Sequence, residues 1–406
     1  MRSRNAIIFV LFILIAGGVV AWQVFGGGKP GGLVGAPSQA ITITMAYTSD
    51  EEDWLKAVTP AFNNSNPKLP SGNTVNIILQ PYEDNAALTA IASGSYTPTI
   101  WSPASTLWIN QLNSKWQAQG NNADLILRSG QYAAAPLVLS PIVFVMWQER
   151  ADPFVEKYGS ADWNTVQQAV TTPNGWAAIC GQVKKAACDP NWGPIKYGQT
   201  DPRASNSGLA ALTLASYSYF SKPGQPKLSD LSSDQLKGAG YNAWVGGLEN
   251  GVYDFGSDSK QQMTDMIIRG PAQYDVVAIY ESLAATQMKN AQGRYGNLKV
   301  FYPSVNIYSD HPYGILLQGS TAEQKDAALL FEQYLLSADV QKQALAFGFR
   351  PANPDVAVVN NDANNPFNKY KDNGLQARIA RTAIATVPNG DIIQQLLTVF
   401  GTQVRR

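Results

Sequence analysis

Charge is scarce in this chain of 406 residues, and neither sign dominates. Lys, Arg, Asp and Glu make up 15% of the sequence, against about a quarter in typical soluble domains. Basic and acidic residues balance at 30 each, without a long run of Lys or Arg. The chain therefore lacks the basic field that recruits nucleic acid, and we expect no nucleic-acid partner.

Histidine occurs once, as His311, and cysteine twice, as Cys180 and Cys188. A Ser-His-Asp hydrolase would have to use this single histidine, and no GxSxG, HExxH or GxxxxGK[ST] motif is present. One histidine and two cysteines are too few ligands for a metal site. Since the catalytic motifs are missing as well, we expect no metal, no cofactor and no catalysed reaction. Two carboxylates far apart in sequence can still hydrolyse glycans, which leaves a glycan-active hydrolase as a minor alternative.

One long apolar run stands at the N-terminus. Arg2 and Arg4 precede twenty uncharged residues, 6–25, which at helical rise cross a bilayer core. Their positive flank belongs on the cytoplasmic side, so the rest of the chain lies outside. We predict a transmembrane signal anchor in residues 1–25 and a Gly-rich linker in 26–39; a cleaved signal peptide is the alternative. In that compartment Cys180 and Cys188 are expected to form a disulfide.

Strand and helix patterns alternate through the remaining residues, which predicts an α/β fold. Residues 41–47, 75–80 and 100–101 read as strands, and each precedes a helical pattern. The remainder exceeds what one core usually supports, so two lobes are expected. Residues 137–147 are apolar but contain Pro141, which indicates two shorter strands or a crossover between lobes. Two closing helices are expected at 374–386 and 391–400.

Hydroxyl side chains follow several predicted strands, at the sheet edge where ligands bind in open α/β folds. Ser49 follows the first strand, and Ser102 and Ser105 follow Trp101. Such residues also serve as plain helix caps, and Trp101 can simply fill the core. The two interpretations stay open on local sequence alone.

The most distinctive stretch is Ser205-Asn206-Ser207-Gly208, directly before the apolar run 209–215. A helix that begins here directs free N–H groups and a positive dipole end toward an anion, although a helix cap alone would look the same. Tyr280 and Glu281 end another predicted strand. A carboxylate there binds hydroxyls or amines and repels an anion unless it is protonated; a salt-bridged glutamate is the alternative.

Four segments together carry a family resemblance: GQTDPRASNSGL at 198–209, DVVAIYE at 275–281, DHPYGILL at 310–317 and GFRPANP at 348–354. With them the chain resembles the type II periplasmic, or extracellular, solute-binding proteins of bacterial ABC importers, and is most similar to the molybdate- and sulfate-type branch. The resemblance implies two α/β lobes with a ligand cleft between them, and an ABC permease as partner. An anchored sensor or assembly protein with the same fold is the alternative.

The resemblance also implies lobe boundaries and ligand contacts. Lobe 1 would comprise residues 40–140 and 299–406, and lobe 2 residues 141–298. The ligand, an oxyanion or a small polar organic solute, would contact Ser49, Ser102, Ser105, Ser205, Asn206, Ser207 and Tyr280. Trp101 and Glu281 are added as candidate contacts from their own positions at strand ends. The chain's 10 Trp and 18 Tyr suit stacking on a sugar better than binding a small tetrahedral anion. Glu281 favours an uncharged or cationic ligand.

Overall fold

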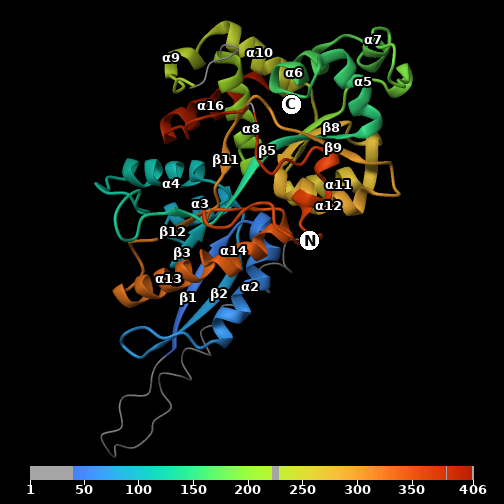
Figure 1. The fold of residues 1–406 in the computed structure, drawn as a ribbon. Coiled ribbons are helices and arrows are strands. Elements are labelled where there is room, and N and C mark those ends of the chain that lie inside the picture. Colours follow the sequence, from blue (N-terminus) through green and yellow to red (C-terminus); the bar gives the residue numbers. More distant parts are fainter. Residues whose placement is uncertain (1–39, 222–227, 381, 405–406) are drawn as a thin grey trace, which may run out of the picture. The chain divides into compact units, whose positions relative to one another are not determined.

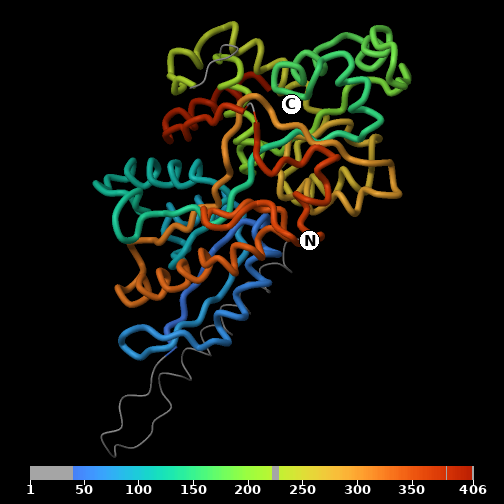
Figure 2. Tube along the Cα trace, in the orientation of Figure 1, coloured from blue at the N-terminus to red at the C-terminus, as the bar shows by residue number. Residues whose placement is uncertain are grey.

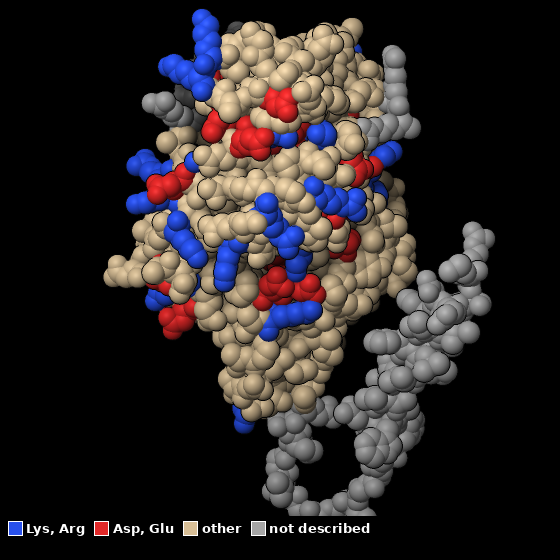
Figure 3. Space-filling view, turned by 90° about the vertical axis from the view of Figure 1, so that its right-hand side faces the viewer, with Lys and Arg blue, Asp and Glu red and all other residues tan. Residues whose placement is uncertain are grey.

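A computed structural model describes residues 40–221, 228–380 and 382–404 (Figure 1). The expected anchor and linker, residues 1–39, lie outside the described residues. Within the described ranges, no helix combines the length and the apolar character needed to span a membrane. Charged side chains are sparse and of mixed sign on the face shown in Figure 3, in keeping with the composition.

The first sheet has the strand order β2-β1-β3-β12-β4. Its strands β1, β2 and β3 run parallel, and β12 is antiparallel to β3. The bounds are β1 Ala40–Tyr47, β2 Thr74–Pro81, β3 Ile100–Ser102, β4 Ala135–Pro136 and β12 Pro312–Ile315. The helices of this part are α2 Glu52–Asn64, α3 Asp84–Ala92, α4 Thr106–Ala118, α13 Ala322–Leu335 and α14 Ala338–Ala344. Figure 2 shows the blue N-terminal strands beside the orange segment that contains α13, so this part is built from two separate stretches of chain.

The second sheet is built around the order β11-β5-β8-β6-β7, with β9 and β13 also paired to β5. Its bounds are β5 Val138–Trp147, β6 Tyr197–Thr200, β7 Val252–Gly256, β8 Val276–Tyr280, β9 Leu298–Phe301, β11 Tyr308–Ser309 and β13 Arg350–Pro351. A separate pair joins β10 Val305–Asn306 to β14 Ala383–Ile384. The larger helices are α5 Gln148–Tyr158, α6 Trp163–Thr171, α8 Asn206–Phe220, α10 Ala239–Asn250, α11 Ser259–Arg269, α12 Glu281–Ala291 and α16 Gly390–Gln403. Short helices are α7 Trp176–Cys180, α9 Ser233–Leu236 and α15 Pro366–Lys369.

Helix burial follows the sequence patterns. In α2 the apolar residues Trp54, Leu55, Val58 and Phe62 are buried, as their helical spacing predicts. Nearly every residue of α8 is buried, because this helix is apolar or small on all sides. It therefore carries its N-terminal residues into the interior of the molecule, which matters for the site described below.

Strand β5 corrects one of the two interpretations of residues 137–147. It is a single continuous strand through Pro141, not two shorter strands. Its neighbours change along its length: β13 and β11 pair with its first four residues, and β8 and β9 with the rest. The chain passes from the first sheet to the second at Leu137, between β4 and β5. It returns between β11 and β12, at Asp310 and His311, later than the expected return near residue 299.

The predicted helix at 374–386 is wrong, and the reason is a buried arginine. Arg350 donates to the carbonyls of Gln376 and Ala377, so these groups face its guanidinium instead of continuing a helical ladder. Gly374 adds a left-handed turn with φ of 104°. Two elements were also missed: strand β7, in which only Val252 is buried, and helix α12, which was read as the end of a strand.

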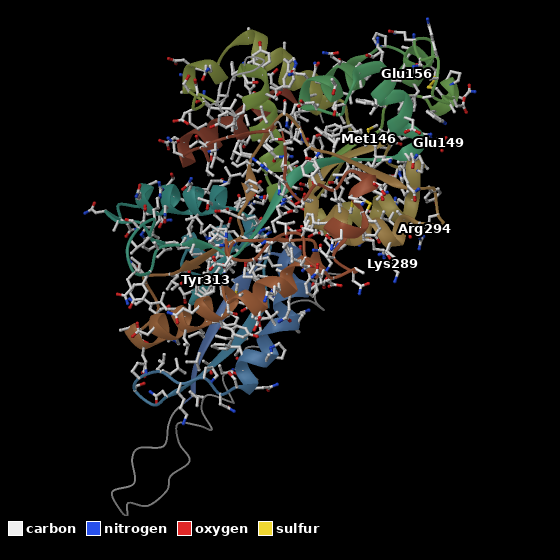
Figure 4. All side chains as sticks on the ribbon, in the orientation of Figure 1. Met146, Glu149, Glu156, Lys289, Arg294 and Tyr313 are labelled. Atoms are coloured by element: carbon white, nitrogen blue, oxygen red, sulfur yellow. A yellow bond between two sulfur atoms is a disulfide. The ribbon has the colours of Figure 1, made fainter. Side chains whose placement is uncertain are left out.

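The predicted disulfide is confirmed between Cys180 and Cys188, whose Cα atoms lie 5.4 Å apart. The loop that it closes is also held by Glu156 of α5, labelled in Figure 4. Its carboxylate accepts the backbone N–H groups of Lys184, Lys185 and Ala186 at 2.6 to 3.0 Å. The disulfide thus constrains an irregular loop locally.

Candidate ligand site

Three parallel strands of the first sheet end in one row. Tyr47 of β1 is in register with Pro81 of β2 and with Ser102 of β3. The residues that follow these strands therefore share one edge of the sheet. Ser49 begins the short helix η1 (Ser49–Glu51) after β1, and Ser105 is the N-cap of α4, where its hydroxyl accepts from the Leu107 N–H.

The second sheet has an equivalent row. Thr200 of β6 pairs in parallel with Gly256 of β7, and Gly198 with Val277 of β8. The N-terminus of α8, the start of α11 and Tyr280 therefore meet at the carboxyl edge of this sheet. Sequence reasoning missed the α11 contribution, since β7 was not recognised as a strand.

Direct hydrogen bonds join the two edges. The Ser105 hydroxyl donates to Asn206 Oδ1 at 2.7 Å, and the Ser49 hydroxyl donates to Asp258 Oδ2 at 2.8 Å. Lys260 adds a partly exposed ion pair with Asp53, at 3.1 Å. Residues 101 to 209 positions apart in sequence thus face each other across one junction, and three of the six, Ser49, Ser105 and Asn206, were named from local patterns.

Asn206 is the centre of this junction. Its Nδ2 donates to the Tyr280 hydroxyl at 2.8 Å and to Ser309 Oγ at 3.0 Å, while its Oδ1 accepts from Ser105. All four side chains are buried. Ser309 was not named from sequence. No local signal marks it, because only the pairing of its strand β11 with β5 brings it to the junction.

Behind Asn206 the serines form a chain of hydroxyl contacts. Ser205 lies 3.0 Å from Ser259, which donates to Ser207 at 2.9 Å, and Ser207 lies 2.7 Å from Thr200. Ser205 occupies the N-cap position of α8 but makes no capping bond with its side chain. The Gly208 N–H donates to the Thr200 hydroxyl at 2.7 Å, so this donor of the helix end already has an acceptor inside the protein.

Trp101 and Ser102 lie deeper. Both are fully buried, Trp101 within the main hydrophobic cluster. The Ser102 hydroxyl donates weakly to the His311 carbonyl, at 3.5 Å. His311 is itself buried, and burial lowers its pKa to about 4, so this histidine is neutral at physiological pH.

Glu281 is the predicted contact that the structure places in an ion pair. Arg350 donates to both of its oxygens, at 2.6 and 2.7 Å, and the Tyr302 hydroxyl donates as well. Burial raises the pKa of Glu281, and the Arg350 charge opposes this rise. Its role as a ligand contact stays a prediction, and the pair must open before Glu281 can meet a ligand.

Several carboxylates at the junction were not named from sequence. They are Asp50 and Glu51 of η1, Glu83 and Asp84 at the start of α3, and Asp258 at the start of α11. Burial, followed by the charges of Asp258, Glu83, Asp84 and Glu51, raises the pKa of Asp50 well above its ordinary value. Within the described ranges, no group of three His, Cys, Asp or Glu side chains converges to hold a metal ion.

Two facing rows of strand-end side chains between two sheets define a two-lobe solute-binding protein. A model of the bacterial extracellular solute-binding protein family matches residues 43–350, and the chain belongs to this family. A sequence search of curated proteins finds no match.

Solved structures of periplasmic binding proteins share the fold. The sulfate-binding protein SubI of Mycobacterium tuberculosis H37Rv is 17% identical, with a TM-score of 0.53 over 90% of this chain and 99% of its own. AfuA of Actinobacillus pleuropneumoniae, solved with fructose-6-phosphate, is 13% identical, with a TM-score of 0.57 over 89% and 98%. A periplasmic thiamin-binding protein is 13% identical, with a TM-score of 0.54 over 94% and 100%. At these identities the likeness shows the fold alone.

Proposed function

We propose that this chain is an extracytoplasmic, membrane-tethered receptor, which captures a small solute between its lobes and presents it to an ABC-type permease. The observation that carries the proposal is the pair of hydrogen bonds Ser105–Asn206 and Ser49–Asp258, which join the two strand edges. A solute that enters the cleft would exchange its water contacts for these polar groups and favour the closed state. The proposal assigns the chain no reaction.

The ligand contacts in this proposal are the residues at the two edges. Ser49, Ser105, Asn206 and Tyr280 face the junction directly through their hydrogen bonds. Ser205 and Ser207 support them from behind, and Trp101 and Ser102 are buried more deeply. The solved structures that share this fold include a sulfate-binding protein, a protein with bound fructose-6-phosphate and a thiamin-binding protein, so the fold leaves the ligand class open.

A ligand panel tests solute binding. Thermal unfolding of the full chain, in a non-ionic detergent, would be followed with oxyanions, sugars, amino acids and amines. A ligand at a hundred times its dissociation constant stabilises the native state by about 2.7 kcal/mol, which raises the melting temperature measurably. We expect one class of solute to do so. Unchanged melting temperatures across the whole panel would contradict the proposed function.

Tethering is tested separately. If residues 6–25 are retained as an anchor, we expect the protein to stay in the membrane pellet after extraction at alkaline pH. Alkaline extraction breaks peripheral charge contacts but does not remove a transmembrane helix from the bilayer. Its intact mass then includes Arg2 and Arg4. Release into the supernatant with a shortened N-terminus would instead show a cleaved signal peptide and leave the binding body free.

A further inference from the structure

The junction between the sheets is strongly acidic. Asp50 and Glu51 follow β1, Glu83 and Asp84 follow β2, and Asp258 follows β7, so the row geometry gathers them from both lobes. The charges that act on Asp50 and Asp84 within the described ranges all come from carboxylates. Lys260, the nearby cation, is engaged by Asp53 and Glu52 at the exposed rim.

Two of these carboxylates have buried oxygens without a partner. Glu51 is 0% exposed, and neither of its oxygens meets a donor at hydrogen-bonding geometry among the described residues. The Ser102 hydroxyl lies close enough to lower the pKa of Glu51, yet its hydrogen bond goes to the His311 carbonyl. Asp50 Oδ1 is likewise buried and unpaired. Buried ionised groups are almost always paired, because desolvation without a partner is costly.

Two other buried carboxylates of the described ranges follow that rule. Glu281 is buried against Arg350, and Asp275 is buried against Arg150, with Trp176 Nε1 and the Lys196 N–H as further donors. Glu249 of α10 keeps one oxygen paired, with Gln199, and one unpaired, whereas Glu51 is the buried carboxylate of the described ranges whose two oxygens both lack a partner. A donor from outside the chain would satisfy both oxygens of Glu51.

Protonation alone does not supply the missing hydrogen bonds of Asp50 and Glu51. Burial raises the pKa of Glu51, and burial with neighbouring carboxylates raises the pKa of Asp50. A protonated carboxyl can donate to one unpaired oxygen beside it, but that single proton leaves the other unpaired oxygens without a donor. An ammonium or guanidinium group supplies several donors and a positive charge together, so one ligand group satisfies several of these oxygens.

We propose that the cleft binds an organic cation that carries an ammonium or guanidinium group, with Asp50 and Glu51 as its principal acceptors. This inference rests on the proposed function and names its ligand class. It departs from the oxyanion that the sequence resemblance favours. At the helix end where an oxyanion would bind, the Gly208 N–H already donates to Thr200, and the carboxylates nearby would repel a negative ligand.

The test compares charge-neutral variants of the full chain. Titration calorimetry would use spermidine, agmatine and choline as cations, against molybdate, sulfate, maltose and manganese chloride. We expect at least one of the three amines to bind the wild type. Asp50→Asn and Glu51→Gln should each weaken its affinity by about tenfold to a hundredfold, because each removes one charge-assisted hydrogen bond.

The matched control is Glu249→Gln. Glu249 of α10 is also fully buried, and its pKa is raised to about 8 by burial, but it accepts from Gln199 away from the junction. We expect unchanged amine affinity in this variant. An equal loss in Glu249→Gln and Glu51→Gln would show that buried charge in general, and not the cleft carboxylates, governs binding, and would overturn the inference.

The pH dependence gives a readout that needs no variant. Amine affinity should rise from about pH 5 to pH 8. The cation binds the ionised carboxylates, and these lose their protons more easily as the pH rises. The groups that face Asp50 and Glu51 are the carboxyls of Glu83, Asp84 and Asp258 and the phenols of Tyr47 and Tyr280. Proton release on binding is measured by calorimetry in buffers of different ionisation enthalpy; binding without proton release, at an affinity independent of pH, would contradict the inference.

The remaining outcomes separate the two proposals. Binding of molybdate, sulfate or maltose, undiminished in Asp50→Asn and Glu51→Gln, would overturn the cation and leave solute binding intact. Binding of manganese alone would overturn the organic cation in the same way. Failure of every solute to bind would contradict the proposed function, and therefore also the inference that rests on it.

Discussion

We expect Arg350→Met to lower the free energy of unfolding by about 3–5 kcal/mol, the range for breaking a buried ion pair from one side. Arg350 donates to both oxygens of Glu281, and both side chains are almost entirely buried. Without the guanidinium, Glu281 keeps its charge in a buried site or takes up a proton. The carbonyl of Ala377 also loses its donor. Chemical denaturation of the full chain measures the loss.

The control for this prediction is Arg203→Met. Arg203 pairs with Asp201, but its side chain is 61% exposed. Exposed pairs contribute about 0–1 kcal/mol, so this variant should unfold almost like the wild type. The double variant Arg350→Met with Glu281→Gln should recover part of the stability, since no buried charge is left unpaired. A loss below 1 kcal/mol in Arg350→Met would show that Glu281 is free for a ligand, which is one of the two alternatives left open by the sequence.

We expect Gly208→Ala to destabilise the protein by about 1–3 kcal/mol, the usual range for overpacking a well-packed site, and to abolish ligand binding. A Cβ at this position would lie 2.1 Å from the Thr200 carbonyl oxygen and 2.7 Å from its carbon. Both atoms belong to the backbone of β6, so the clash cannot be relieved by a side-chain rotation. The N-terminus of α8 must shift, and Ser205, Asn206 and Ser207 shift with it.

Gly401→Ala in α16 is the matched control. It is also a helical glycine, and a Cβ there meets nothing within 4 Å. Alanine is favoured over glycine in a helix by up to about 1 kcal/mol, so this variant should be slightly more stable than the wild type and should bind ligand normally. Normal ligand binding by Gly208→Ala would show that the close approach of α8 to β6 does not position the site.

Local sequence patterns predict much of the fold because their causes are local. The helix α13 begins at Thr321, whose hydroxyl accepts from the Gln324 N–H in a complete capping box. Strands β1 and β2 and helix α2 likewise follow their apolar periodicity closely. The serines at the junction were recognised for the same reason, since small hydroxyl residues between a strand and a helix are visible in the sequence.

The carboxylates of the cleft were not predictable in this way. Asp50, Glu51 and Asp84 lie in first turns of helices, where acidic residues are common and stabilise the helix dipole. Only the register of β1 with β2, and the contact of Ser49 with Asp258 across 209 positions, brings them together. The Glu281–Arg350 pair spans 69 positions and is equally invisible to local patterns.

The most direct test of ligand capture between the two strand edges is the affinity of Asn206→Ala, measured by titration with the solute that the panel identifies. Asn206 contacts Ser105 from the first lobe and Tyr280 and Ser309 from the second. The control is Asn113→Ala. Asn113 is as buried and makes as many side-chain hydrogen bonds, to Leu125 and Ile126, but within the first lobe alone.

Both variants should lose a similar amount of stability, about 1–3 kcal/mol, because each leaves buried polar groups unpaired. We predict that only Asn206→Ala weakens the ligand, by about tenfold or more, since each hydrogen bond lost at the junction contributes roughly 0.5–1.5 kcal/mol and several are lost together. Equal affinity in Asn206→Ala, Asn113→Ala and the wild type would place the ligand elsewhere and contradict this account.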